Sequence, residues 1–199
     1  MSLTPNPFRR AAVALTAAGL LLAPLAGCGA ADAPAPSAGA ASHTPRAAGT
    51  PKAPAPARLT VPSLGIDSAL MRLGLNEDGT VEVPPAEKGM TAGWYAGGAV
   101  PGEQGAAVLI GHNDTRFGKA VFHDLHSIAE GADIVVADGT GEESHFTVTG
   151  TETVSKKTFP TEKVYGATGE HVLRLVTCDG AFDADGHPVD NLIVYATLR

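Results

Sequence analysis

Short apolar runs separated by turn-forming residues dominate the chain from residue 58 onward. Each run holds three to five residues rich in β-branched or aliphatic side chains, a pattern typical of strands rather than helices. We therefore predict a mostly β domain, built as a barrel or a sandwich. The runs expected to form strands are Leu59–Val61, Ala69–Met71, Ala107–Ile110, Ile134–Val136, His145–Val148, Val172–Val176 and Leu192–Ala196.

Turn residues separate several of these runs. Asn76–Gly79, Asp138-Gly139 and Asp185-Gly186 contain residues that tolerate the positive φ angles needed where a hairpin reverses. Helical periodicity is sparse. The best candidate is an amphipathic helix over 119–128, whose apolar positions are Ala120, Val121, Leu125 and Ile128.

The first 28 residues have the order of an export signal. Arg9 and Arg10 precede the uncharged apolar stretch Ala11–Ala26, which at 16 residues is short for a bilayer span. The stretch ends in Leu25-Ala26-Gly27-Cys28, which resembles the lipobox of bacterial lipoproteins, in which the cysteine thiol receives lipid. The alternative is an uncleaved signal anchor in which Cys28 is incidental. Both alternatives predict a domain outside the cytoplasm, anchored to the outer face of the cytoplasmic membrane.

Residues 29–57 are predicted to form a disordered linker. This segment contains 12 Ala, 6 Pro and 3 Gly among 29 residues, so it lacks large apolar side chains to offset the entropy cost of ordering. The predicted organisation is therefore an export signal over 1–28, a linker over 29–57 and one folded domain over 58–199.

The charge balance excludes one class of partner. The 199-residue chain has 14 Lys and Arg against 21 Asp and Glu, a formal net charge of -7. Residues 58–199 alone hold ten basic and twenty acidic residues, a net charge of -10. A nucleic-acid binder needs a broad basic face, so nucleic acid is not expected as a partner.

The residue pattern gives little support for a metal site or for a serine nucleophile. Asp183, Asp185, Gly186 and Asp190 suggest a calcium loop, but the EF-hand spacing and its final Glu are missing, so an acidic turn is favoured. The pair His123 and His126 has no further Cys or His at zinc spacing and is interpreted as surface histidines. Ser127, Ser144 and Ser155 lack the glycines of a nucleophile elbow. No metal and no cofactor is predicted.

Cys178 is the first candidate nucleophile. If Cys28 carries lipid or lies in an anchor, Cys178 has no partner for a disulfide, and a free thiol in an oxidising compartment invites a chemical role. It follows the predicted strand Val172–Val176 and precedes Asp179-Gly180, where a strand meets a loop. The alternative is an inert buried cysteine that packs as a small apolar residue.

His112 is the matching candidate base. It follows the predicted strand Ala107–Ile110 and Gly111, so it also stands at a strand end. A thiol with a pKa of ~8.5 is mostly protonated at neutral pH, and a nearby imidazole stabilises the thiolate and protonates a leaving amine. Taken alone, His112 is equally compatible with a loop histidine.

These residues resemble those of a known family. Leu175-Val176-Thr177-Cys178 is similar to the sortase signature Thr-Leu-X-Thr-Cys, and Gly111-His112-Asn113 resembles the sortase segment that supplies the histidine. The resemblance to the actinobacterial class F sortases covers nearly all of residues 58–199. It implies a closed β-barrel of about eight strands with one or two short helices. The further similar stretches are Arg58–Ile66, Pro101–Glu103, Ala120–Phe122, Phe159–Thr161 and Asp190–Ala196.

The resemblance implies a cysteine transpeptidase. Cys178 would attack the Thr-Gly carbonyl of an LPXTG-like sorting signal to form a thioester, with His112 as proton donor and acceptor. An amine of a cell-wall peptide or of a pilin lysine would then resolve the thioester. Thr177, as a signature residue, is a candidate for orienting the substrate.

One departure from the family pattern concerns arginine. Sortases generally use an Arg on the strand after the cysteine loop, where this chain has Asn191 or its neighbours. Asn191 is a candidate hydrogen-bond donor to the oxyanion, with a structural residue at the strand entry as the alternative. Arg174 and Arg116 are interpreted as surface charges. The missing Arg keeps open a second function, a non-catalytic lipoprotein binding module on a sortase-like barrel.

Overall fold

The computed structural model describes residues 53–182, 184 and 188–199. The predicted export signal with Cys28, the linker up to residue 52 and the predicted turn at Asp185-Gly186 lie outside the described residues. The first strand begins at Pro56, two residues before the predicted start of the folded domain.

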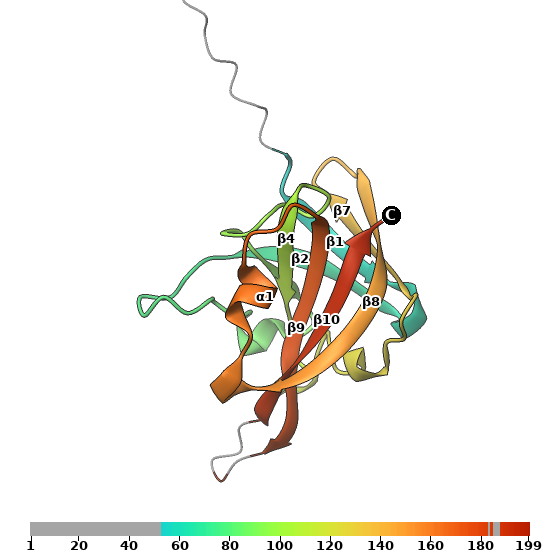
Figure 1. Cartoon of the computed structure of the whole chain (residues 1–199). Helices are drawn as coiled ribbons and strands as arrows, with labels where there is room; N and C mark the ends of the chain where they lie inside the picture. Colours follow the sequence, from blue (N-terminus) through green and yellow to red (C-terminus); the bar gives the residue numbers. More distant parts are fainter. Residues whose placement is uncertain (1–52, 183, 185–187) are drawn as a thin grey trace, which may run out of the picture. The chain divides into compact units, whose positions relative to one another are not determined.

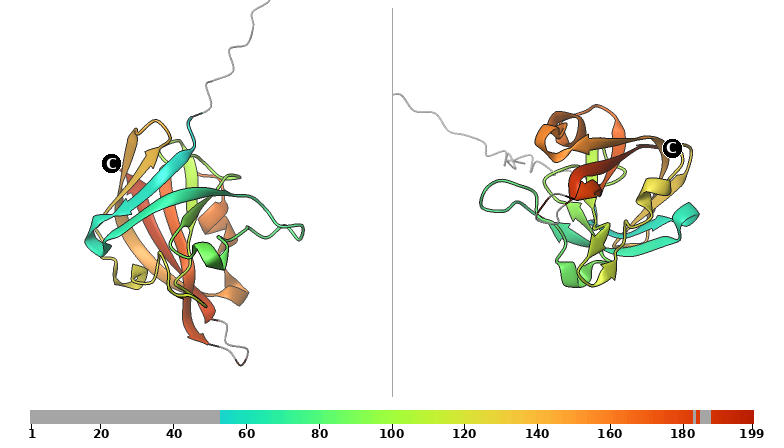
Figure 2. Two further views of the ribbon diagram at one scale, coloured as in Figure 1. Left: turned by 180° about the vertical axis from the view of Figure 1, so that it is seen from behind. Right: turned by 90° about the horizontal axis from the view of Figure 1, so that it is seen from below.

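Eight strands close into one barrel (Figure 1, Figure 2). They are β1 (Pro56–Val61), β2 (Ile66–Leu73), β3 (Ala92–Tyr95), β4 (Gly105–Ile110), β7 (Asp133–Asp138), β8 (Glu143–Ser155), β9 (His171–Phe182) and β10 (Pro188–Leu198). Their order around the barrel is β1-β2-β3-β4-β9-β10-β8-β7, and β7 pairs with β1 to close it. The predicted mostly β fold and the closed barrel are confirmed.

All seven predicted strand segments lie within strands of this barrel. The pattern missed β3, because Ala92-Gly93-Trp94-Tyr95 has no β-branched residue. Trp94 is buried in the core, and its indole Nε1 donates to the carbonyl oxygen of Ala99 at 3.0 Å. The pattern also missed β5 (Asp114–Thr115) and β6 (Gly118–Lys119), which form a separate two-stranded sheet.

The predicted helix over 119–128 is wrong. Only the short 3-10 helix η3 (Leu125–Ser127) forms there. The apolar positions were read correctly as buried, but the backbone amides bond to other segments: Val121 N–H donates to the Gly89 carbonyl and Phe122 N–H to that of His112. Tertiary hydrogen bonds at the start of the segment, and local bonds to the third residue before at His123, Leu125, Ser127 and Ile128, therefore replace the helical ladder.

The remaining helices are short. They are the 3-10 helices η1 (Pro62–Leu64), η2 (Ala86–Lys88) and η4 (Lys156–Thr158), and the α-helix α1 (Thr161–Tyr165). In the described part of the chain, no helix has the length and apolarity needed to cross a bilayer.

Alternation along the strands divides the apolar side chains between two clusters. The larger cluster fills the barrel and includes Leu109, Leu173, Leu175 and Phe122. The smaller cluster lies on the outside, where Val164 of α1 packs with the outward-facing side chains Val108, Ile110, Val176 and Ile193 (Figure 1). Strands β4 and β9 are therefore covered on both faces.

The predicted turns form where described. The amide of Gly79 donates to the carbonyl of Asn76, and Gly79 has a φ of 82°. Between β7 and β8 the Asp138 carboxylate accepts hydrogen bonds from the amides of Thr140 and Glu142. The positive φ in that turn falls on Gly141 rather than on Gly139.

We expect Phe146→Ala to lower the free energy of unfolding by about 3–5 kcal/mol, because the ring is fully buried in the barrel and its loss leaves a cavity. Urea denaturation measures this change. The matched control is Phe117→Ala, since Phe117 is 65% exposed and its loss should cost about 0.5 kcal/mol or less. Equal unfolding midpoints for the two variants would contradict the packing of Phe146.

Candidate functional site

A cavity of about 680 Å³ opens on the outer face of the barrel and holds both predicted reactive residues. Cys178 lies within β9, four residues before the strand ends, so the prediction that it stands where a strand meets a loop is wrong. His112 follows the end of β4 by two residues, and Asn191 lies on β10. Loop residues between β2 and β3 form the opposite wall. The full lining is Leu75, Gly79, Thr80, Val81, Val83, Pro84, Tyr95, Ile110, Gly111, His112, Lys156, Phe159, Thr161, Tyr165, Val176, Thr177, Cys178 and Asn191.

The parallel pairing of β4 with β9 sets Cys178 beside His112. The register pairs Ile110 with Val176, and the amide of Gly111 donates to the carbonyl of Val176 at 3.1 Å. His112 and Cys178 each follow this pair by two residues. Since side chains alternate along a strand, both belong to the outer face shared by Ile110 and Val176.

Cys178 is half-buried and is a free thiol. Its backbone carbonyl accepts a hydrogen bond from Asn113 Nδ2 at 3.2 Å. Asn113 directly follows His112, so this bond ties the histidine segment to the cysteine strand beyond the end of their backbone ladder.

His112 is half-buried and held at one ring nitrogen. Its Nε2 lies 2.6 Å from the carbonyl oxygen of Pro84. A carbonyl only accepts, so Nε2 is the donor of this bond, and Nδ1 is the ring nitrogen that the bond does not use. Within the described residues no hydrogen bond joins the ring to the thiol of Cys178. Among the described residues, Nδ1 of His112 therefore has no hydrogen-bond partner.

Asn191 and Thr177 occupy different faces. Asn191 pairs with Cys178 in the antiparallel register of β9 and β10, and both side chains face the cavity. Thr177 is 3% exposed, and its hydroxyl has no hydrogen-bond partner in the described structure. By strand alternation it shares the inner face with Leu175. Only the backbone of Thr177 remains available to a ligand in the cavity.

Neither of the two arginines considered from the sequence lines this cavity. Arg174 lies on the same strand face as Cys178 but four residues earlier, about 13 Å along the strand. Its guanidinium carbon lies 4.7 Å from the Tyr195 ring centroid, and burial lowers the pKa of Arg174. Arg116 forms an exposed ion pair with Glu87. The cavity instead has Lys156, which the sequence analysis passed over.

An aromatic wall was also missed from the sequence. The rings of Tyr95 and Tyr165 meet edge to face with centroids 5.6 Å apart, and Phe159 packs on Tyr165 at 6.1 Å. These residues come from β3, α1 and the turn before α1, and together they supply apolar contact area for a ligand. The wall joins β3 to the stretch 159–165, which follows it by more than sixty residues.

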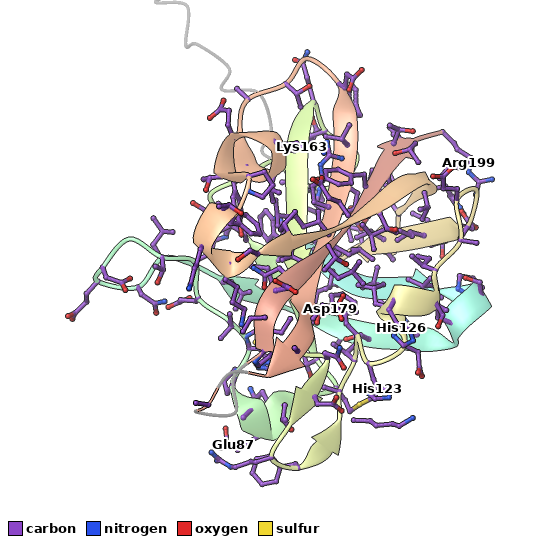
Figure 3. All side chains as sticks on the ribbon, turned by 60° about the horizontal axis from the view of Figure 1, so that its bottom comes forward. Glu87, His123, His126, Lys163, Asp179 and Arg199 are labelled. Atoms are coloured by element: carbon purple, nitrogen blue, oxygen red, sulfur yellow. The ribbon has the colours of Figure 1, made fainter. Side chains whose placement is uncertain are left out.

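His123 and His126, labelled in Figure 3, are both absent from the lining of the cavity. His123 Nδ1 lies 3.0 Å from Asp114 Oδ1, and His126 Nδ1 lies 3.2 Å from the carbonyl of His123. Over the described ranges, no group of three or more His, Cys, Asp or Glu has metal-binding geometry.

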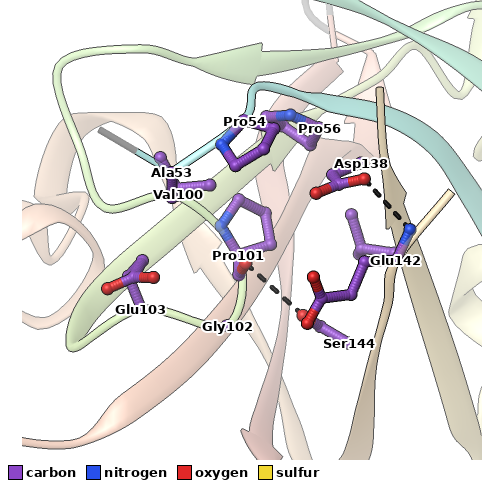
Figure 4. Close-up of a pocket in the computed structure, with 11 residues that line it drawn as sticks. Ala53, Pro54, Pro56, Val100, Pro101, Gly102, Glu103, Asp138, Glu142 and Ser144 are labelled. Atoms are coloured by element: carbon purple, nitrogen blue, oxygen red, sulfur yellow. Dashed lines mark hydrogen bonds between the residues drawn. The ribbon is translucent and has the colours of Figure 1, made fainter. Parts of the chain in front are cut away.

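Other hollows on the barrel contain none of the candidate residues. One, of about 150 Å³, lies between Pro54, Pro101 and Glu142, and its walls are fixed by the bonds Glu142 N to Asp138 and Ser144 Oγ to the Pro101 carbonyl (Figure 4). Another, of about 480 Å³, is lined by Arg174 and by Lys163. Only the larger cavity combines a thiol with an imidazole.

Comparison with known proteins agrees with this geometry. Residues 59–199 match the protein-family model of the sortase domain. The chain belongs to the sortase family. The sortases are extracytoplasmic, membrane-associated cysteine transpeptidases, so the match indicates that class of enzyme for this sortase domain. A comparison with curated protein sequences found no match.

Solved sortases share the fold of this sortase domain. Sortase A from Corynebacterium diphtheriae, as a lid mutant, superposes with a TM-score of 0.57 at 19% identity, covering 73% of this chain and 70% of that one. Sortase C-1 from Actinomyces oris gives 0.57 at 20% identity, covering 72% and 71%. Sortase C1 from Streptococcus agalactiae gives 0.56 at 20% identity, covering 72% and 66%. At this identity the likeness establishes the barrel.

The aromatic wall leads to a prediction on titration. Burial, with a smaller contribution from Tyr95, raises the pKa of Tyr165 to about 12. A phenol whose folded pKa exceeds its unfolded value of about 10 stabilises the fold below pH 10, and this stability is lost as pH rises through about 12. We expect Tyr165→Phe to remove the tyrosinate absorbance step near pH 12 and to flatten the stability loss above pH 10. Loss of a step near pH 10 instead would contradict the burial of this phenol.

Proposed function

We propose that the protein is a class F sortase that cleaves an LPXTG-like sorting signal through a thioester on Cys178. The observation that carries the proposal is the parallel register of β4 and β9, which sets Cys178 and His112 on one face of one cavity. A half-buried thiol beside an imidazole at the end of an apolar cavity is suited to attack on a peptide carbonyl.

The first half-reaction breaks the Thr-Gly amide bond. Nδ1 of His112 takes the proton of the Cys178 thiol, the thiolate adds to the carbonyl carbon, the C–N bond breaks, and the Gly amine leaves with that proton. The acyl group stays on Cys178 as a thioester. Because Nε2 of His112 already donates to the Pro84 carbonyl, Nδ1 is the nitrogen that we assign to the proton transfer.

The second half-reaction restores the free enzyme. An amine of a cell-wall peptide or of a pilin lysine gives up its proton to His112 and attacks the thioester carbonyl. The new amide bond forms as the C–S bond breaks, and the departing Cys178 thiolate takes the proton back from His112 to give the free thiol. Water is the poorer acceptor and yields hydrolysis when no amine is bound.

Asn191 and Asn113 are assigned supporting roles. The amide of Asn191, opposite Cys178 in the register, would donate a hydrogen bond to the tetrahedral oxyanion, a contribution of about 3 kcal/mol in comparable sites. Thr177 would orient the substrate through its backbone, since its hydroxyl is buried. Asn113 is a positioning residue that fixes the Cys178 carbonyl relative to the histidine segment.

The remaining proposals concern tethering. The export signal over 1–28, with lipid on Cys28 or as an uncleaved anchor, would hold the enzyme on the outer face of the cytoplasmic membrane. The linker over 29–57, fully extended at about 3.1 Å per residue, spans roughly 90 Å. The catalytic domain over 58–199 would thereby reach substrates within the cell wall.

We expect the purified domain to cleave a fluorogenic LPXTG-type peptide, and Cys178→Ala to abolish cleavage because no other thiol lies in the cavity lining. Mass spectrometry of a trapped acyl-enzyme identifies the residue and the bond together. The control is Lys119→Ala, an exposed change outside the cavity. Normal turnover by Cys178→Ala would refute the mechanism.

The rival function is a non-catalytic binding module, favoured by the absence of any Arg from the described cavity lining. Alkylation of Cys178 by iodoacetamide separates the two functions. A catalytic thiol should react at neutral pH at a rate that His112→Ala lowers about tenfold or more, because the imidazole stabilises the thiolate. A slow alkylation whose rate is the same in wild type and in His112→Ala would favour the binding module.

A further inference from the structure

Among the described residues that line the cavity, Lys156 is the single one with a permanent charge. It begins η4, directly after β8, and lies beside the aromatic wall formed by Tyr95, Phe159 and Tyr165. The other lining residues are apolar, glycine, hydroxyl-bearing or amide residues, together with His112 and Cys178. The electrostatic preference of the cavity therefore depends on this one ammonium group.

The ammonium group of Lys156 is available to a ligand. Within the described part of the chain it takes part in no ion pair and no side-chain hydrogen bond. Lys163, on the neighbouring helix, is by contrast occupied by the Glu152 carboxylate, which raises the pKa of Lys163. An ammonium group next to apolar and aromatic surface attracts an anion more strongly than one in open water.

The positive charge of Lys156 is opposite in sign to the net charge of the domain. Residues 58–199 carry a net charge of -10, which repels anionic peptides at long range. A positive group inside the cavity reverses that tendency locally. Such a group selects ligands with a carboxylate at one position rather than acidic peptides in general.

The place of Lys156 in the barrel argues against a role at the reacting carbonyl. Its neighbour Ser155 on β8 pairs with Asp190 of β10, and β10 in turn pairs with β9, which carries Cys178. Two strand spacings separate β8 from β9, about 10 Å between backbones. The long side chain of Lys156, at the start of η4 just beyond β8, thus lines the cavity wall, whereas Asn191 lies directly opposite Cys178.

We propose that Lys156 selects sorting signals whose variable residue X in the LPXTG-like motif is Glu or Asp. The proposal rests on the function proposed above. An extended peptide advances about 3.3 Å per residue, so X lies within reach of the wall when the Thr carbonyl sits at Cys178. Leu, Pro, Thr and Gly are fixed by the motif, so X is the position within it that can carry the carboxylate.

The experiment compares peptides that differ only by Glu or Gln at X. Cleavage gives kcat/KM for each peptide, and binding to the Cys178→Ala variant gives Kd without turnover. We expect the Glu peptide to be favoured about fivefold or more by either measure, an effect in the range of partly exposed ion pairs. Lys156→Gln should reduce the Glu-to-Gln ratio to about one.

The matched control is Lys157→Gln, because Lys157 is the next residue of η4, equally exposed and absent from the cavity lining. It should keep the wild-type ratio. Lys156→Glu should instead favour a peptide with Lys at X. These results together would support the proposal.

Several outcomes would overturn it. They are a wild-type ratio near one, an unchanged ratio in Lys156→Gln, and an equal loss of ratio in Lys157→Gln. If Lys156→Gln lowers kcat/KM equally for both peptides, Lys156 acts at the reacting carbonyl and the proposal is wrong. Failure to cleave any peptide would count against the enzyme function, whereas the Kd ratios measured with Cys178→Ala still decide the role of Lys156.

Discussion

The parallel pairing between β4 and β9 is the constraint on which the candidate site depends. Both strands are covered on two faces, by the barrel interior on one side and by the cluster under α1 on the other. A slip of one residue in this register would turn Cys178 or His112 to the opposite face of the sheet. Burial of apolar side chains on both faces therefore keeps Cys178 and His112 in the lining of one cavity.

The loop at 111–128 holds the chain in place beyond Ile110, where the pairing of β4 with β9 ends. A Cβ on Gly111 would lie 2.6 Å from the Phe122 ring and 2.7 Å from Val121, so glycine is needed where this loop closes on the strand. The amide of Phe122 donates to the carbonyl of His112. The segment 119–128, predicted as a helix, thus contributes side chains to the barrel core and holds the backbone of His112 by a hydrogen bond.

The cavity wall has a polar part, formed by strands, and a mostly apolar part, formed by a loop and aromatic residues. The ends of β4, β9 and β10 present polar groups in fixed register, which suits a reaction that needs set geometry. The β2–β3 loop and the aromatic residues around α1 present mostly apolar area, which suits binding of a peptide. The barrel fold is shared with sortases at about 20% identity, while the residue opposite Cys178 is here an asparagine.

The linear pattern of residues determined most of the strands and singled out the two candidate residues of the site. Alternating and apolar runs marked seven of the eight barrel strands, and the sequence marked Cys178 and His112, which the structure places in one cavity. The pattern missed β3 and mistook 119–128 for a helix, because helical spacing does not reveal where backbone amides find their acceptors.

Only the tertiary structure decided how those residues meet. Whether β4 and β9 are neighbours, and in which register, depends on contacts between segments more than sixty residues apart. The same holds for Lys156 and Lys157, which are identical and adjacent in sequence, yet only the first lines the cavity. Thr177 and Cys178 are also adjacent in sequence, yet the side chain of Thr177 faces the core and that of Cys178 faces the cavity. Neighbouring side chains of a strand point to opposite faces, and only the closed barrel decides which face is the interior.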